Sequence, residues 1–337
     1  MGVEWCGRLL AGSGCERDTI VTESCYISGL AYRVGRVTDL AELVAIESRG
    51  MLPLEFYISR GLKNYCIQEE STELLCTTVV KSSLEAAGTG ADEIAAVVLG
   101  IVTNGPALAE QQAMTAGLSA AGIGSVPLLM ISPSEECSGF VAALEAARRT
   151  LCATGFAGKV LIIVSGRVMP GSSRIDPSTA TILSDGIAAC ILSLEPGPFK
   201  LLAAFSHTSP ELVPAAGPDA TPGPDILRGY KNLKIVANRL YEYCQLEAEC
   251  IEALFCTNGS LVYSAYSAAA AALSPDRAFQ DTIPRFGHVH ACDHVIGLAE
   301  YGRARGHKDG AVYMLLSWSP HVYGGVLVRS NMSGSLV

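Results

Sequence analysis

Residues 128–152, which read LLMISPSEECSGFVAALEAARRTLC, decide the fold of this chain. A short apolar run of strand length is followed by a turn-prone acidic segment, and then by apolar residues that recur three and four positions apart. Such spacing is typical of one buried helical face. Cys137 stands where the turn meets the predicted helix, and there unpaired backbone N–H groups and the helix dipole favour a thiolate. This pattern is typical of a nucleophile presented at the edge of a sheet, although an unreactive buried thiol fits it equally well.

The same alternation continues on both sides of that stretch. The first half of the chain has further helical patterns at 71–87 and 111–121, and buried strand patterns at 94–101, 159–165 and 187–194. Buried β runs that alternate with helices indicate an α/β protein whose sheets are covered on both faces.

A Pro- and Gly-rich stretch at 195–225 interrupts this rhythm. We place a domain boundary at 195–199, which divides the chain into 1–198 and 199–337, and interpret the rest of the stretch as surface loops. Beyond it the patterns predict helices at 227–242, 245–254 and 260–273, and strands at 254–256, 313–317 and 325–329. Both halves thus share a rough β-α-β-α-β order.

Composition excludes several classes of protein. The chain has 337 residues, is 49% hydrophobic and carries a net charge of −9, which argues against nucleic acid as a general partner. Its twelve cysteines form no CxxC pair, which argues against a zinc knuckle or a disulfide framework and fits a reducing cytoplasm. The N-terminus lacks the basic start of a secretion signal, and the apolar runs are too short to span a bilayer. We therefore expect a cytoplasmic protein with no membrane association.

Several motifs, taken in order, resemble the ketoacyl-ACP synthase III branch of the thiolase superfamily. The matching blocks are an acidic-acidic-Ser motif (69–71), the nucleophile motif (136–140), an Asp-rich loop with the start of a strand (176–180 and 184–186), an Arg-aromatic-Gly motif (285–287) and the closing strand (324–329). The resemblance extends from about Cys25 to the C-terminus. It implies the thiolase fold, a duplicated α/β/α/β/α sandwich of five layers, and a homodimer.

The departures from the family pattern concern the residues that do the chemistry. Condensing members use Cys, His and Asn, and the last two donate hydrogen bonds to the malonyl thioester carbonyl. Here the segment that should hold the His reads FCTNGS (255–260), and His288 stands where the Asn should be, with Asp293 five residues later. This arrangement resembles the acyltransferase-like offshoot of the branch, which uses a Cys-His-Asp triad.

The resemblance implies a role for each of these residues. Cys137 carries the acyl group, His288 takes its proton and later activates a hydroxyl or amine acceptor, and Asp293 fixes the imidazole tautomer. His290 is the alternative base. The oxyanion is expected to be held by the backbone N–H groups of Cys137 and Ser319. Further candidates for the pocket are His207, Thr257, Asn258, His290 and Trp318.

Two further patterns concern partners and metals. Arg228, Lys231 and Lys234 recur at helical spacing, and Lys234 stands in a context that resembles the family's docking site for the acidic acyl carrier protein; a solvated helix face is the alternative. The run HVHACDH (288–294) resembles the zinc motif of metallo-β-lactamase folds. It has one residue too many, however, and only about forty residues follow it, so we expect no metal.

The sequence therefore predicts an acyltransferase of secondary-metabolite biosynthesis, of the polyketide or antibiotic type. The donor is expected to be an acyl carrier protein or coenzyme A thioester, the acceptor a small molecule, and no cofactor is expected to stay bound. A starter-unit β-ketoacyl synthase III that forms a C–C bond is one alternative. A non-catalytic partner that forms a heterodimer with a condensing enzyme is another.

Overall fold

The computed structural model describes residues 24–46, 52–103, 105–176, 181–210 and 226–332. Its largest sheet has nine strands in the order β11-β12-β13-β10-β1-β9-β6-β4-β5. The first half of the chain contributes β1 (Cys25–Val34), β4 (Ile94–Thr103), β5 (Leu128–Ile131), β6 (Lys159–Arg167) and β9 (Gly186–Ser193). The second half contributes β10 (Phe199–Thr208), β11 (Ile251–Cys256), β12 (Val312–Trp318) and β13 (Val322–Ser330).

The two halves of this sheet repeat one arrangement. In each half the last strand lies between the first strand and an inner one, and runs antiparallel to both: β9 between β1 and β6, and β13 between β10 and β12. The remaining neighbours are parallel, β6 with β4 and β4 with β5 in the first half, β11 with β12 in the second. The first strands of the two halves, β1 and β10, pair with each other and join the two sets of strands.

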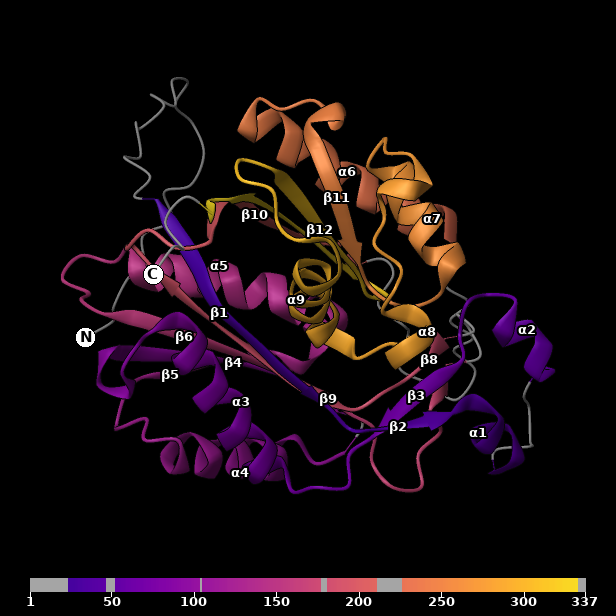
Figure 1. Ribbon diagram of the computed structural model, residues 1–337, viewed down its shortest axis with the longest axis horizontal. Coiled ribbons are helices and arrows are strands. Elements are labelled where there is room, and N and C mark those ends of the chain that lie inside the picture. Colours follow the sequence, from indigo (N-terminus) through magenta and orange to yellow (C-terminus); the bar gives the residue numbers. More distant parts are fainter. Residues whose placement is uncertain (1–23, 47–51, 104, 177–180, 211–225, 333–337) are drawn as a thin grey trace, which may run out of the picture.

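Helices cover both faces of each half, so that five layers result (Figure 1). The outer helices are α3 (Thr72–Ala87) and α4 (Ala107–Ala120) on the first half, and α6 (Ile226–Cys244) and α7 (Leu261–Ala270) on the second. The middle layer is formed by α5 (Gly139–Leu151) and α9 (Asp293–Arg305), which lie between the two sets of strands. The predicted α/β class and the duplicated five-layer sandwich are thus confirmed.

The middle layer holds the largest apolar core. All five apolar positions that predicted the helix behind Cys137 are buried, namely Phe140, Val141, Leu144, Ala147 and Leu151. They pack in one cluster with residues of α9 and of strands from both halves. The helix proper begins at Gly139, after the short 3₁₀ segment Pro133–Ser138, and its last turn carries Arg148 and Arg149, which suit the negative end of the helix dipole.

Smaller elements form a lobe at one end of the sheet (Figure 1). They are β2 (Arg36–Asp39), α1 (Leu40–Ile46), α2 (Leu54–Ile58), β3 (Asn64–Ile67), β7 (Ile175–Asp176), β8 (Thr181–Ile182) and α8 (Ile283–Phe286). Their apolar side chains form a separate cluster that includes Tyr57, Tyr65 and Ile283. This cluster fixes α8, from which the chain continues to His288.

The structure corrects two predictions about elements and shows a helix that the sequence did not predict. The segment predicted as loops after residue 199 contains β10, a central strand whose buried positions alternate at its start. The helix predicted at 245–254 is wrong, because Gln245 adopts a φ of 52° after α6, and a 3₁₀ turn leads directly into β11. Helix α9 was not predicted.

The strands of the first half end at β9 and those of the second half begin at β10, close to the boundary placed at 195–199. The division into domains 1–198 and 199–337 stays a prediction. Within the described ranges, no helix combines the length and the apolar character needed to cross a bilayer.

Candidate active site

The side chains of Cys137, His288 and Asp293 form a continuous chain of contacts. The Sγ of Cys137 lies 2.9 Å from Nε2 of His288, and Nδ1 of His288 lies 2.6 Å from Oδ2 of Asp293. The three residues come from the start of the central helix, the segment after α8 and the first position of α9. The structure therefore brings together the three residues that the sequence predicts as a triad.

The Asp293 carboxylate is held by donors from two sides. Its Oδ1 accepts the backbone N–H of Val289 at 2.9 Å, and its Oδ2 accepts the backbone N–H of Asn258 at 2.8 Å. The side-chain amide of Asn258 lies 3.3 Å from Oδ1 and also donates to Thr282. With 2% of its surface exposed, Asp293 is a buried carboxylate whose orientation the surrounding backbone fixes.

Electrostatics favour a charged imidazole at His288. Burial alone lowers its pKa, but Cys137 and then Asp293 raise it, and the balance holds the pKa of His288 well above its usual value. The imidazole of His288 is therefore favoured in its protonated, charged form.

The His288 segment is bonded to residues 182–184 in the manner of a short strand. The His288 N–H donates to Ile182 O at 2.9 Å, and the Ser184 N–H donates to His288 O at 2.8 Å. This close approach depends on Gly287, whose φ is 63° and where a Cβ would lie 3.0 Å from Ile182 O and 3.1 Å from Ser184 Oγ. The imidazole is therefore placed by two backbone bonds that His288 itself makes, directly after that glycine.

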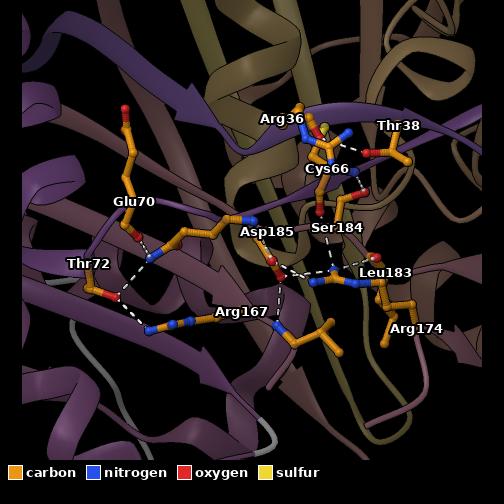
Figure 2. Close-up of polar contacts among 12 residues, drawn as sticks. Arg36, Thr38, Cys66, Glu70, Thr72, Arg167, Arg174, Leu183, Ser184 and Asp185 are labelled. Carbon is orange, nitrogen blue, oxygen red and sulfur yellow. Dashed lines mark hydrogen bonds and ion pairs between the residues drawn. The ribbon is translucent and has the colours of Figure 1, made fainter. Parts of the chain in front are cut away.

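A buried ion pair anchors the 182–185 segment in turn (Figure 2). Asp185, 1% exposed, accepts hydrogen bonds from the two terminal nitrogens of the Arg174 guanidinium, at 3.0 Å and 2.6 Å. It also accepts the backbone N–H groups of Gln68 and Val168, each at 2.8 Å. Four donors from three segments thus converge on one carboxylate. The sequence analysis matched residues 184–186 to a family motif but did not assign Asp185 this structural role. Its position directly before the buried strand β9 was the only feature of the sequence that indicated the role.

Glu136, next to the nucleophile, has an unusual backbone. Its φ of 44° and ψ of −123° lie in a region that residues with a Cβ rarely occupy. Burial and then the charge of Asp176 raise the pKa of the Glu136 carboxyl, His288 opposes the shift, and the net pKa is about 7. Near neutral pH a good part of this carboxyl is therefore protonated, which weakens its repulsion of a thiolate on Cys137.

His290, the alternative base, lies behind His288. The two ring centroids are 5.1 Å apart, and the His290 imidazole fills the space beside Gly166, where a Cβ would come within 2.5 Å of its Cδ2. Burial, followed by the charges of His288 and Arg174, holds the pKa of His290 well below its usual value. The sulfur of Cys137 makes its hydrogen bond with His288, as the preferred prediction had it.

The other predicted pocket residues have structural contacts. The hydroxyl of Thr257 accepts the Trp318 N–H at 3.1 Å, and the Trp318 ring packs edge-on against Tyr263 at 4.7 Å. Asn258 donates its backbone N–H to the Asp293 carboxylate, as described above. His207 lies on β10 opposite Tyr323 of β13, and not in an interdomain loop.

The predicted second oxyanion donor is contradicted by the structure. The backbone N–H of Ser319 donates to Val322 O at 2.9 Å and closes the turn between β12 and β13. Its side-chain oxygen accepts the N–H of Ser138 at 3.2 Å. The turn bond could not be foreseen by counting back from the closing strand, and it removes Ser319 from the candidate oxyanion hole in this conformation.

The three predicted docking residues, Arg228, Lys231 and Lys234, all lie on α6 with exposed side chains. Figure 1 shows α6 in an outer layer, away from the central helices. The helix and the exposure fit both a docking surface and a solvated face.

Comparisons with known proteins agree with this fold. The model of the family 3-oxoacyl-[acyl-carrier-protein (ACP)] synthase III matches residues 133–210. No curated protein sequence matches the chain.

Similar solved structures include ChlB3, described as an acyltransferase, with a TM-score of 0.78, 19% identity and coverage of 91% of this chain and 98% of that chain. FabH from Pseudomonas aeruginosa, a 3-oxoacyl-(acyl carrier protein) synthase III, has a TM-score of 0.75 and 19% identity, with coverage of 91% of this chain and 98% of that chain. A variant of OleA from Xanthomonas campestris has a TM-score of 0.75 and 14% identity, with coverage of 91% of this chain and 99% of that chain.

These findings agree with the resemblance drawn from the motifs. The chain has the thiolase fold of these structures, and one segment of it matches the synthase III family model. At such low identities the likeness fixes the fold alone.

Proposed function

We propose that this chain is an acyltransferase that carries an acyl group as a thioester on Cys137 and passes it to a hydroxyl or amine. The observation that carries the proposal is the unbroken contact from the Cys137 sulfur through His288 to Asp293. A nucleophile, a base and a carboxylate in this order are the parts that acyl transfer requires.

In the first half-reaction the Cys137 thiolate attacks the carbonyl carbon of the donor thioester. A new S–C bond forms, the donor's S–C bond breaks, and the departing thiolate takes the proton from the His288 imidazolium. In the second half-reaction the acceptor gives its proton to Nε2 of His288 and attacks the acyl carbon, and Cys137 leaves as a thiolate. Asp293 stabilises the imidazolium in both steps, and the backbone N–H of Cys137 is the proposed donor to the oxyanion.

Transfer to oxygen or nitrogen is favoured over C–C bond formation by what replaces the condensing pair. At the position of the family's His, the Asn258 amide is bound to Asp293 and Thr282, and the Thr257 hydroxyl accepts from Trp318. The Asn258 amide, which already donates to Asp293 and Thr282, is therefore not left to join a second donor on a malonyl thioester carbonyl. The similarity to ChlB3 points the same way.

The match to the synthase III family supports the second candidate, a β-ketoacyl synthase that uses the rearranged triad. For either enzyme we propose an acyl carrier protein or coenzyme A thioester as donor. The α6 surface of Arg228, Lys231 and Lys234 is the proposed docking site for an acidic carrier. A homodimer, a cytoplasmic location and a place in secondary-metabolite biosynthesis belong to the same proposal.

Intact-mass spectrometry of the full chain after incubation with acyl carrier protein and acyl coenzyme A thioesters tests the proposal. We expect an acyl adduct on the wild type, none on Cys137→Ala, and loss of the adduct when a nucleophilic acceptor is added. Carbon dioxide released from malonyl carrier protein favours the synthase. No adduct with any thioester contradicts both enzymes and favours the non-catalytic partner.

A further inference from the structure

His290 occupies its place at an energetic cost that the proposed reaction does not explain. It is 8% exposed, and its Nε2 is buried without a hydrogen-bond partner in the described part of the chain. Its φ of 52° lies in the left-handed region, where a side chain with a Cβ is disfavoured. An orphaned buried polar atom costs about 1–3 kcal/mol, and a bound ion is one of the ways in which such an atom is satisfied.

The neighbours of the His290 ring suggest the ligand. The Sγ of Cys137, an imidazole nitrogen of His288 and one of His290 all lie within 4.8 Å of one another. Among the residues described, this is the one group of three Cys, His, Asp or Glu side chains that converges in this way. One thiolate and two imidazoles form a donor set for zinc and similar soft or borderline cations.

The surroundings complete the geometry of a metal site. A histidine that ligates zinc through Nε2 usually donates its Nδ1–H to a carboxylate, and Asp293 lies 2.6 Å from Nδ1 of His288. Zinc lies about 2.3 Å from sulfur and about 2.0 Å from nitrogen in tetrahedral sites, which sets the two ligand atoms about 3.5 Å apart. The present 2.9 Å between Sγ and Nε2 would need to widen by about 0.6 Å.

We propose that Cys137, His288 and His290 bind a thiophilic divalent cation of the zinc class, which competes with the acyl group for the sulfur. On binding, an S–metal bond forms, and the proton shared by the sulfur and Nε2 is released to solvent. The nitrogens of His288 and His290 supply the other two lone pairs, and a fourth position stays open to water. The metal-bound form is inactive in acyl transfer, because the nucleophile and the base are both occupied.

Cobalt(II), a spectroscopic substitute for zinc, tests the site without any assay of activity. The full-length protein is reduced, freed of metal with a chelator and titrated with Co²⁺ in the absence of oxygen. We expect a near-ultraviolet sulfur-to-cobalt band that saturates at one ion per chain and disappears when Zn²⁺ is added. Cys137→Ser should remove the band.

The decisive variant is His290→Asn, since asparagine tolerates a positive φ and keeps the backbone while the imidazole is removed. We expect it to bind Co²⁺ at least about tenfold more weakly. His307→Asn, a change at a half-buried histidine packed against Phe199 and Tyr313, is the matched control and should leave the affinity unchanged. Thermal unfolding of both variants shows that they are folded.

Cobalt binding without the sulfur band, no saturable binding at all, or equal affinity in the wild type and His290→Asn would each overturn the proposal. Blocking Cys137 with iodoacetamide should also abolish the band. Because the readout is spectroscopic, its result does not depend on whether any acyl adduct forms, so failure of the metal site and failure of the proposed acyltransferase are told apart.

Discussion

At the scale of single residues, Asp293 shows how a charge can be fixed by the backbone around it. Its two oxygens accept from Val289, Asn258 and His288, so an amide in its place would bring a donor against other donors. Asp293→Asn should lower the rate of adduct formation on Cys137 by on the order of 10⁴, because His288 then loses its orienting acceptor. Timed intact-mass measurements give the rate.

The exposed Asp281, which pairs with Arg305 at 3.5 Å, offers the matched control. Asp281→Asn should leave the rate unchanged. A rate in Asp293→Asn within threefold of the wild type would mean that the carboxylate does not orient the base.

Glu136 permits a second test at this scale, of stability rather than rate. Backbone strain of this kind costs about 1–3 kcal/mol, and glycine has no Cβ to create it. Glu136→Gly should therefore be more stable than Glu136→Ala by about 1 kcal/mol, although glycine also loses more entropy on folding. Urea unfolding of the two variants measures the difference. Both changes remove the carboxyl, so equal stabilities, or a more stable Glu136→Ala, would contradict the prediction that relief of strain outweighs the entropy that glycine loses.

Sequence reasoning could find Cys137, His288 and Asp293 because their places in ordered motifs are visible in the chain. It could not predict which donor would pair with which acceptor in the folded protein. The Ser319 N–H was predicted to bind the oxyanion, but it donates to Val322 O in a turn. Asn258 was predicted to line the pocket, but it donates to Asp293. The positive φ of Glu136 likewise depends on how the turn meets the helix, and no residue type in that segment predicts it.

At the scale of elements, the Arg174–Asp185 pair connects β3, the end of β6 and the segment bonded to His288 (Figure 2). Asp185→Asn removes the charged carboxylate that pairs with the buried guanidinium of Arg174, and breaking a buried pair from one side costs about 3–5 kcal/mol. We expect a loss of that order in the free energy of unfolding, together with slower acylation of Cys137, since the imidazole loses its anchored support.

An exposed pair supplies the comparison. Glu252→Gln removes the ion pair with Lys308, whose side chain is 71% exposed, and should cost no more than about 1 kcal/mol. Equal losses in the two variants, or a destabilised Asp185→Asn that acylates at the wild-type rate, would show that the pair does not position His288.

The elements that the sequence predicted well are those with a long apolar period or a continuous buried run, such as α3, α5 and β6. The failures have physical reasons. Strand β10 follows a proline-rich turn, and its neighbours β1 and β13 lie far from it in the chain. Helix α9 is buried on almost all sides in its first turns, so it shows no polar face there from which a helical period could be recognised.

At the scale of the whole molecule, the triad lies where the two halves of the duplication meet. Cys137 precedes α5, Asp293 begins α9, and these helices form the layer shared by both sets of strands (Figure 1). Helix α5 contacts β4 and β6 of one half and β10 and β13 of the other. The 2.9 Å contact between Cys137 and His288 therefore spans the junction, and it persists only while both halves are folded against each other.

The same shared layer predicts that the two halves unfold together. Leu144 is fully buried on α5 in the cluster common to both halves, and replacing such a leucine with alanine costs about 2–5 kcal/mol. In urea, Leu144→Ala should lower the midpoint measured by far-ultraviolet circular dichroism and the midpoint measured by Trp318 fluorescence by the same amount, in a Trp5→Phe background. Leu227→Ala, at a side chain 73% exposed, should move neither. If the dichroism of Leu144→Ala split into two steps while Trp318 in the second half reported one, the halves would be separate folding units, and the contact between sulfur and imidazole would depend on their docking rather than on a common core.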